Sequence, residues 1–388
     1  MSRPRWKERT IGEICDFTNG SGFKPSDWGK EGLPIIRIQN LNGSRGFHYF
    51  AGMTDKRRIV EPGDLLFAWA GTRGVSFGPT LWKGERGVLN QHIYSINPHE
   101  GIDKQWLYHT LQLITSRIEA KAHGFKSTLV HVHKSEITKQ VVSVPPLNEQ
   151  LKIARILHTW AVGIETTENL LAAKIELRGN LLQQLITGKK RFREFLDREW
   201  LETTFDKVLN ETSIPGSDGR TAKKLTVKLY GKGVIQKRDE RLGSKGTRYY
   251  VRRAGQFIYS KLDFLNGAFG IVPEHLDGFE STLDLPAFEI DETVDSRWLL
   301  YYVTRQAFYG RFSQAAEGGR KARRVHPLEF LKTKIRLPEL EEQHRIGDAL
   351  RTCDSEVQTL KDFLDALKRQ KRGLMQKLLT GQIRVNSK

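Results

Sequence analysis

Residue patterns that would support catalysis are incomplete in this chain of 388 residues. A Walker A loop needs Gly-Lys followed by Ser or Thr. Here the Gly-Lys pairs at 29–30, 188–189 and 231–232 are followed by Glu, Lys and Gly. An enzyme that methylates an exocyclic amine needs an Asn/Asp-Pro-Pro-aromatic stretch, but the Pro-Pro pair at 145–146 is followed by Leu147. We therefore expect ATP binding and methyl transfer to reside in other proteins.

Candidate metal ligands are also too few to form a site. Asp103, Glu119 and Lys121 resemble part of a nuclease motif, but residues two apart on a helix point to different faces, so we interpret them as surface charge. His131 and His133 could face the same way on a strand, yet no cluster of Cys or carboxylates completes a metal site. For these histidines we expect packing or a phosphate contact.

Basic residues exceed acidic ones in two separate blocks. The formal net charge is +18; residues 1–143 carry 20 Lys and Arg against 13 Asp and Glu, and residues 200–336 carry 24 against 17. Residues 220–261 hold 13 basic and 2 acidic side chains, whereas residues 274–295 hold 8 acidic and none basic. A solvated surface without a partner would mix the two signs. We expect a positive face that binds a polyanion, with double-stranded DNA as the first candidate.

Composition also bounds the domain count and the compartment. A chain of this length exceeds one ordinary core, so two or more domains are expected. Cys15 and Cys353 are the only cysteines, too few for a disulfide scaffold or a zinc site. No apolar run has membrane-spanning length, and no signal-peptide pattern follows Met1. We expect a protein of the reducing cytoplasm.

The chain repeats itself at an offset of 193 residues. LNEQLKIARIL at 147–157 is matched by LEEQHRIGDAL at 340–350, and LITG at 185–188 is matched by LLTG at 378–381. Further positions match at offsets of 192 to 194, among them Trp6 with Trp200, Trp106 with Trp298, and Val132-His133 with Val325-His326. We interpret the whole chain as a tandem duplication of one half.

A long helix follows each repeated opening. In the second copy, apolar residues alternate spacings of three and four from Ile346 to Leu378, which is the seam of a coiled coil interrupted by Lys371. The first copy keeps the same register from Ile153 onward. At 1.5 Å per residue, residues 147–187 predict a rod of roughly 60 Å. An apolar stripe of that length needs a partner, and the simplest partner is the other copy, packed antiparallel.

Each half begins with a domain of short strands followed by one helix. The runs at 35–41 (IIRIQNL), 64–70 (DLLFAWA) and 256–260 (QFIYS) are rich in β-branched or aromatic residues, so they predict strands. Apolar residues at helical spacing then predict a helix with Asp103 as N-cap and Gly124 as its stop. The counterpart of this helix is expected to begin near Ser296.

The predicted fold class is therefore α+β, with a pseudo-two-fold axis. Two mixed α/β target-recognition domains, at 1–143 and 200–336, are joined by spacer helices within 144–199 and 337–388 that form an antiparallel coiled coil. Two basic domains related by a two-fold axis suit duplex DNA, whose grooves recur at intervals of a helical turn. Because the domains differ in sequence, we expect them to read two different half-sites.

The order of domain, helix, domain, helix resembles the specificity (S) subunit of type I restriction-modification enzymes. The resemblance lies in PPLNEQLKIA and PELEEQHRI at the helix openings, LITG and LLTG at their ends, and TIGEICDFTNGSGFK, VKLYGKGVIQKR and SKLDFLNGAFGIVP in the heads. It implies a non-catalytic DNA reader that holds two methyltransferase (M) subunits, joined by restriction (R) subunits. It assigns S-adenosylmethionine, ATP and magnesium to those partners and no cofactor to this chain. We expect partners to dock on charged outer faces of the rods: Arg155, Glu165, Glu168 and Glu176, and Asp348, Glu356, Lys361 and Asp365.

Candidate DNA contacts combine cations that bind phosphate with amides able to pair with base edges. In the first domain they are Asn19, Ser21, Lys24, Arg37, Gln39, Asn40, Arg73, Gln91, His92, Lys126 and Ser127. In the second they are Lys228, Tyr230, Lys232, Lys237, Arg238, Lys245, Arg248, Lys261, Asn266, Arg320, Lys321, Arg323 and Arg324. Some of these cations could equally be solvated surface charges, and Tyr230 could belong to a core.

Two other functions stay open on the residues alone. One is a self-sufficient DNA-modifying or DNA-cleaving enzyme with an unrecognised site, which the incomplete motifs disfavour. The other is a coiled-coil scaffold that binds DNA without enzyme partners. Neither the DNA sequence recognised nor the length of its spacer follows from composition, because base choice depends on how side chains sit in the grooves.

Overall fold

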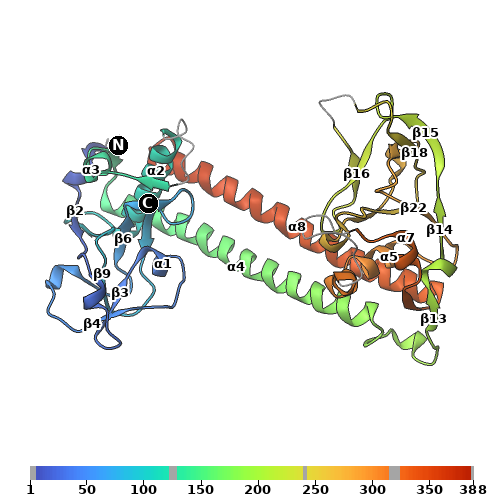
Figure 1. Ribbon diagram of the computed structural model, residues 1–388. Coiled ribbons are helices and arrows are strands. Elements are labelled where there is room, and N and C mark those ends of the chain that lie inside the picture. Colours follow the sequence, from blue (N-terminus) through green and yellow to red (C-terminus); the bar gives the residue numbers. More distant parts are fainter. Residues whose placement is uncertain (1–5, 122–128, 239–242, 314–323, 386–388) are drawn as a thin grey trace. The chain divides into compact units, whose positions relative to one another are not determined.

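The computed structural model describes residues 6–121, 129–238, 243–313 and 324–385, and the chain forms two compact units (Figure 1). Unit 1 comprises residues 1–169 and 362–388, and unit 2 comprises residues 170–361. Each unit holds one β-rich head together with part of each long helix, α4 (Leu147–Ile186) and α8 (Leu340–Leu379). The unit boundary therefore crosses both helices, whereas the sequence suggested a division between heads and helices.

Both heads are built on the same antiparallel framework. In unit 1 a four-stranded sheet has the order β2 (Cys15–Asn19), β10 (Ile93–Pro98), β6 (Leu65–Ala68) and β8 (Gly78–Leu81). In unit 2 the same order is kept by β14 (Leu209–Thr212), β22 (Ala287–Ile290), β19 (Phe257–Tyr259) and β20 (Phe269–Ile271). A strand pair accompanies each sheet: β1 (Lys7–Thr10) with β12 (Val141–Val144), and β13 (Leu201–Thr204) with β23 (Lys334–Leu337). The two frameworks therefore correspond to the two copies of the tandem duplication.

The heads differ in what is inserted between the framework strands. In unit 1 a second sheet has the order β4 (Tyr49–Phe50), β3 (Leu33–Ile36), β9 (Gly87–Leu89) and β5 (Ile59–Val60), and β7 (Ala70–Thr72) pairs with β11 (Leu129–His131). In unit 2 the additions are β15 (Ile214–Asp218), β18 (Arg248–Val251) and β21 (Glu280–Ser281), and the hairpin β16 (Leu225–Val227) with β17 (Val234–Gln236). Each second sheet takes strands from two insertions, because β9 and β21 come from the later one. The variable parts of the heads are therefore confined to defined places on a shared scaffold.

The strand expected at 35–41 is only partly present. β3 ends at Ile36, and Ile38–Leu41 forms the single helical turn α1. The Asn40 side chain causes this break, because its Oδ1 accepts a hydrogen bond from the Arg37 backbone N–H at 2.9 Å. The runs at 64–70 and 256–260 contain strands as predicted, although the first ends at Ala68 and β7 begins at Ala70.

Each framework sheet packs against a head helix and against the long helices. In unit 1 the helix is α2 (Lys104–Lys121), which begins with the predicted cap, since Asp103 Oδ1 accepts from the Trp106 N–H at 2.8 Å. The predicted stop, Gly124, lies outside the described residues. In unit 2 the main head helix is α5 (Ser296–Val303), followed by α6 (Gln306–Tyr309) and α7 (Pro327–Leu331). Trp106 and Trp298, the two equivalent tryptophans of α2 and α5, are fully buried at the centres of the two cores.

The two long helices contain 40 residues each, as the seam spacing predicted, and they run antiparallel within each unit. In unit 1 Lys368 of α8 bonds Glu168 of α4 at 2.7 Å, while Leu378 and Leu157 share the core of the head. In unit 2 Lys174 bonds Glu356 at 2.7 Å and Arg178 bonds Asp354 at 2.7 Å. Every predicted seam residue from Ile153 to Leu185 and from Ile346 to Leu378 is buried or half-buried. At 1.5 Å per residue each helix is about 60 Å long.

Several charges that we expected to remain free on the outer faces are ion-paired. Besides Glu168 and Glu356, Glu165 pairs with Lys83 of head 1 at 3.5 Å. Asp348 pairs with Arg297 at 2.5 Å and with Arg351 at 3.3 Å. The expectation was wrong for these four acids, because the antiparallel register and the adjoining heads bring a cation to each of them.

Among the described residues, no helix is long and apolar enough to cross a membrane.

The repeated Glu-Gln pair fastens each head to the start of its long helix. Gln150 accepts from the Asp103 N–H at 2.8 Å and donates to the Gly101 and Pro145 carbonyls at 3.1 and 2.9 Å. Gln343 repeats this pattern with Asp295 at 2.9 Å, Thr293 at 2.9 Å and Pro338 at 2.8 Å. Both glutamines are almost fully buried. Since a buried amide must be hydrogen-bonded, this residue is specified by the junction between head and helix.

The glutamates bind the far end of the other long helix. Glu149 accepts from Arg384 at 2.7 and 2.8 Å and from the Trp6 indole at 3.0 Å. Glu342 accepts from Arg191 at 2.9 and 2.7 Å and from the Trp200 indole at 2.8 Å. Gly381 and Gly188 lie against the same two rings with φ of +74° and +70°. After each Thr-Gly helix end the chain turns and brings an arginine to the glutamate at the start of the other long helix. Both residues of each pair lie in the same unit.

Candidate nucleic-acid interface

Several predicted residues of head 1 gather around Trp69, at the end of β6. The Trp69 indole donates to the Gln91 carbonyl at 3.1 Å and lies 3.4 Å from Asn19 Oδ1. Its ring centroid is 5.0 Å from that of His92 and 4.8 Å from that of His131. We call Asn19, Trp69, Gln91, His92 and His131 the Trp69 cluster. It places exposed amides beside aromatic rings, a combination that suits base edges and stacking.

A serine and an arginine border the Trp69 cluster. The Ser21 N–H donates to the Leu89 carbonyl at 2.8 Å, which fixes the loop after β2 beside β9. Ser21 Oγ accepts from Arg58 at 2.8 Å. Arg58 was not among the predicted contacts, and its exposed guanidinium adds a cation able to bind phosphate.

Other predicted residues of head 1 are placed differently. Lys24 and Gln39 are exposed, and the Arg37 guanidinium lies 4.4 Å from the Trp28 ring with one buried nitrogen unpaired. Asn40 is buried and donates to the Ser44 and Gly46 carbonyls at 3.0 Å, and Arg73 donates to the Glu119 carbonyl at 2.8 Å. Asn40 and Arg73 thus hold the head together, so we leave them out of the proposed interface. Lys126 and Ser127 lie outside the described residues.

In head 2 the turn between β16 and β17 carries a strained, exposed tyrosine. We call residues 228–233 the Tyr230 loop. Tyr230 is the only non-glycine residue in the described part of the chain with a positive φ, +60°, and its side chain is 67% exposed. Two backbone bonds hold it there: Tyr230 N–H to the Asn266 carbonyl at 2.9 Å and Gly231 N–H to the Gly267 carbonyl at 2.8 Å. Lys228, Lys232 and Asn266 are exposed around it, so four predicted residues are brought together.

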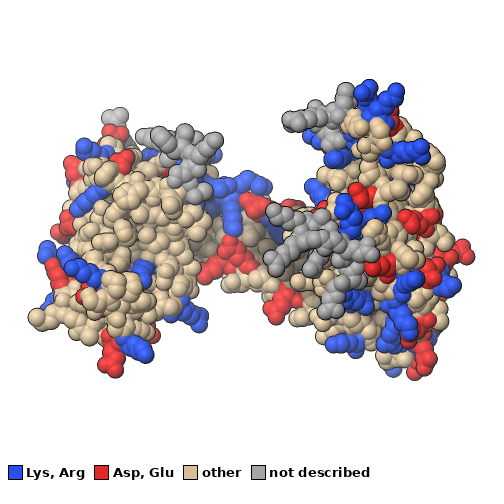
Figure 2. Space-filling view, viewed as in Figure 1, with Lys and Arg blue, Asp and Glu red and all other residues tan. Residues whose placement is uncertain are grey.

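A second group of head 2 residues lies in the segment from the end of β17 to the start of β18. Lys237, Arg238, Lys245 and Arg248 are exposed, and the Gly243 N–H bonds the Gly219 carbonyl at 3.1 Å. Figure 2 shows Lys and Arg side chains gathered on unit 2 near the end where β15 and β18 lie. We call these four residues the β17–β18 cations. Lys223 and Arg220, which were not predicted, are also exposed in this segment.

Not every cation of the basic segment is available to DNA. Arg252 is fully buried and donates to Ser281 Oγ and to the Thr212 and Leu285 carbonyls at 2.8 to 3.0 Å. Burial lowers the pKa of Arg252 to about 10. Arg324 pairs with Asp284 at 3.6 Å, near the half-buried Lys261. Arg320, Lys321 and Arg323 lie outside the described residues.

The acidic stretch at 274–295 is used largely inside head 2. Glu280 is buried and accepts from the Ser217 N–H at 2.6 Å, while Asp277 pairs with Arg253 at 3.3 Å. Asp295 caps α5 and binds Arg297 at 2.6 Å. These acids form contacts inside the head, so they neutralise fewer exposed cations than their number suggests.

Comparison with known proteins identifies the family. Residues 4–177 match the family described as the type I restriction modification DNA specificity domain. The specificity subunit of the type I restriction enzyme EcoBI from Escherichia coli is 26% identical over 53% of this chain and 47% of its own length. That of MjaVIII from Methanocaldococcus jannaschii is 22% identical over 98% and 94%. The crystal structure of an S subunit from M. genitalium has the same fold, with a TM-score of 0.55, 17% identity and 96% of both chains covered. Residues 4–177 belong to this family, and the chain as a whole is similar to the type I restriction-modification specificity subunits.

As a specificity subunit, the chain is the DNA-reading and non-catalytic member of such an enzyme. The residues that resembled a nuclease motif have structural roles, since Asp103 caps α2 and Glu119 Oε1 accepts from the Gly74 N–H at 2.8 Å. His131 packs on Trp69, and its ring is 6.4 Å from that of His133. In the part of the chain that the structure describes, no group of three or more His, Cys, Asp or Glu side chains could hold a metal.

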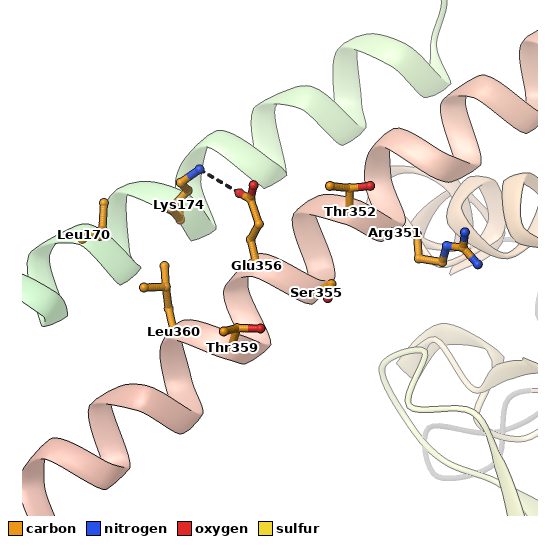
Figure 3. Close-up of a pocket in the computed structure, with 8 residues that line it drawn as sticks. All are labelled: Leu170, Lys174, Arg351, Thr352, Ser355, Glu356, Thr359 and Leu360. Carbon is orange, nitrogen blue, oxygen red and sulfur yellow. Dashed lines mark hydrogen bonds and ion pairs between the residues drawn. The ribbon is translucent and has the colours of Figure 1, made fainter.

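The paired helices of the specificity subunit also carry a groove. Figure 3 shows it in unit 2, between α4 and α8, with Leu170 and Leu360 among its lining residues and the Lys174–Glu356 bond across it. Its volume is about 640 Å³. Leu170 is 48% exposed, so an apolar surface remains open between the two helices.

Proposed function

We propose that this specificity subunit binds double-stranded DNA and that each head reads one half of a bipartite target. Head 1 reads through the Trp69 cluster with Ser21 and Arg58, and head 2 reads through the Tyr230 loop and the β17–β18 cations. The observation that carries the proposal is that one repeated framework supports two different inserted sheets. Polar and aromatic groups for direct readout lie on or beside those insertions, and exposed cations flank them.

The partners in this proposal are two M subunits, docked on the paired helices, with R subunits joining them in the full cytoplasmic complex. S-adenosylmethionine, ATP and magnesium then belong to the partners, and the long helices set the distance between the half-sites. The groove at Leu170 and Leu360 supports the docking role, because an exposed apolar strip between charged side chains suits a partner helix.

Methylome sequencing of cells that carry the M subunit and variants of this chain tests the division of labour. The double variant Asn19→Ala/Gln91→Ala should relax recognition at positions in one half-site only, because each lost base contact is worth about 1–3 kcal/mol of discrimination. Lys237→Ala/Arg238→Ala should weaken binding of all sequences about equally. If the first variant changes both halves of the motif, the heads do not read separately.

The alternative functions make different predictions for the isolated chain. With S-adenosylmethionine, or with magnesium and ATP, the purified chain should neither methylate nor cut DNA, and added M subunit should restore adenine methylation at a bipartite site. Activity of the chain alone would support a self-sufficient enzyme. DNA binding without any capture of M subunit would support a scaffold.

A further inference from the structure

The duplication allows equivalent side chains of the two units to be compared directly. In unit 2 the Asp354 carboxylate of α8 accepts from Arg178 Nε at 2.7 Å, from the second Arg178 nitrogen at 3.3 Å, and from the Tyr301 hydroxyl at 2.6 Å. Burial and Asp354 raise the pKa of Tyr301, while Arg178 and Arg351 act in the opposite direction. Asp354 thus binds one guanidinium and one phenol, while Arg351, nearly one turn before it on α8, pairs with Asp348 at 3.3 Å.

Unit 1 has different polar groups at the surrounding positions and lacks the carboxylate. The long helices repeat at an offset of 193 and the head helices at 192, as Trp106 and Trp298 show. The counterparts in unit 1 are Lys371 for Arg178, His158 for Arg351, His109 for Tyr301, and Ala161 for Asp354. Lys371 and two histidine rings therefore occupy the positions of two guanidiniums and a phenol, and Ala161 occupies that of the carboxylate.

Among the described residues, neither His109 nor Lys371 bonds a carboxylate. His109 is 1% exposed; its Nδ1 lies 3.0 Å from Gln112 Oε1, and its Nε2 is buried without a partner. Burial lowers the pKa of His109 to about 4, helped by the charges of Lys371 and His158 and opposed by Asp103. Lys371 has no ion pair among the described residues, and burial lowers its pKa. A buried polar atom without a partner marks a place where a ligand group can supply the missing bond.

The space needed for such a group is present. A cleft of about 970 Å³ in unit 1 is bordered by His109, His158 and Ala161, and its walls include Trp82 and Val162. Arg45, Lys83, Glu85 and Glu165 also line it, and the Glu165–Lys83 ion pair at 3.5 Å accounts for one acid and one cation. Aromatic and aliphatic walls beside a basic end suit one acidic side chain carried on a protein segment, and the volume exceeds what a single small anion fills.

We propose that this cleft binds an acidic side chain of a partner protein, whose carboxylate takes the place that Asp354 fills in unit 2. The partner is an M subunit, and in this respect the inference rests on the proposed function. The carboxylate would lie among His109, His158 and Lys371, and His109 would gain a proton as it binds. Asp103, which also acts on the pKa of His109, does not supply this carboxylate, because it is engaged as the cap of α2. The two halves of the specificity subunit would then receive their partners unequally, since one site is filled by its own aspartate.

The site itself is tested without any partner by NMR of the histidine rings in the full chain. His109→Gln assigns the His109 signal. In Ala161→Asp the pKa of His109 should rise by about 1–3 units, because an opposite charge arrives within a few ångströms. Ala161→Asn, which adds the same bulk without charge, should leave the pKa nearly unchanged. An unchanged pKa in Ala161→Asp would mean that position 161 does not face His109, and the inference would fail.

Calorimetric titration of the same variants with purified M subunit tests the occupant. Ala161→Asp should weaken one of two binding events by about tenfold or more, because its carboxylate repels an incoming one, while Ala161→Asn should have a smaller effect. Equal weakening by both variants would indicate crowding and overturn the carboxylate. If the unmodified chain binds no M subunit, the proposed docking of M subunits is wrong, whereas the His109 titration still decides whether the site exists. In that case acetate serves as the probe of the site. Equal rises of the His109 pKa with acetate and with phosphate would show that the ligand is a free anion.

Discussion

Replacing Glu149 by alanine should destabilise unit 1 more than a typical surface substitution. The side chain of Glu149 is 3% exposed and that of Arg384 is 21% exposed, and three hydrogen bonds join Glu149 to Arg384 and Trp6. Removing one partner of a buried ion pair costs about 3–5 kcal/mol, because the other charge stays buried without compensation. Since Arg384 retains some contact with water, we expect a value near the lower end, about 3 kcal/mol. Whole domains are stable by only about 5–15 kcal/mol, so the loss would be large.

The assay is urea unfolding of the wild type, Glu149→Ala, Arg384→Ala and the double variant, followed by circular dichroism. The double variant should lose less than the sum of the single variants, with a coupling above about 0.5 kcal/mol. Glu342→Ala is the matched variant in unit 2 and should behave similarly, because Glu342 binds Arg191 and Trp200 in the same way. A loss below about 1 kcal/mol for Glu149→Ala would place this pair with ordinary surface ion pairs and refute the reasoning.

Four further predictions follow from the same contacts. Burial alone would raise the pKa of Glu149, but the hydrogen bonds from Arg384 and Trp6 outweigh burial and lower that pKa. The stability that these bonds contribute is present above the unfolded pKa of about 4.3 and is lost as the pH falls through the folded pKa. Acid titrations of stability should therefore be flatter in Glu149→Gln than in the wild type. Gly188→Ala should lower the free energy of unfolding by about 1 kcal/mol or more in thermal melts, because φ is +70° and a Cβ would lie 3.2 Å from the Trp200 ring. The control Gly179→Ala lies in open space inside α4 and should stabilise the chain. Lys228→Gln/Lys232→Gln should reduce the salt slope of DNA binding by about 2, while Lys361→Gln on α8 should leave it unchanged. Deleting one heptad from each long helix removes about 10 Å, so the spacer in the methylated motif should contract by about three base pairs at 3.4 Å each; methylation at the original spacing would show that the helices do not set it.

The long helices could be predicted closely from the sequence because their signal is periodic and repeated. The spacing of apolar residues from Ile153 and Ile346 predicted the seam of each helix. The repeat at an offset of 193 indicated that each long helix packs against the other. Asp103 was recognisable as a cap because it immediately precedes a helical pattern. The seam did not reveal which charges meet across it, because those pairs depend on the register of two segments distant in the chain.

The candidate DNA contacts could be predicted less well because composition does not report hydrogen-bond partners. Asn40 and Arg73 had suitable side chains, but nearby carbonyl oxygens already accept from them. Trp69 and His131 were missed as members of a cluster, since β7 and β11, which bring them together, pair residues about 60 positions apart. An aromatic residue directly after a buried strand was the available signal for Trp69. Glu149 and Gln150 were read as the opening of a helix, whereas their burial explains why both copies retain them.

The origin of the inserted strands limits how a new DNA specificity can arise by recombination. β3 and β5 lie between β2 and β6, but their neighbour β9 lies between β8 and β10, and β3 and β9 pair in parallel. Exchange of residues 20–64 alone would set a foreign β3 against a native β9. A crossover pair that encloses residues 20–92 transfers both insertions of that sheet with the two framework strands between them, and among the inserted strands only β7 then meets a native partner, β11. Since the framework keeps the same strand order in both heads, the exchanged segment meets strand edges that already match it, so whole-segment exchange can alter recognition in one event while point substitutions change it one contact at a time.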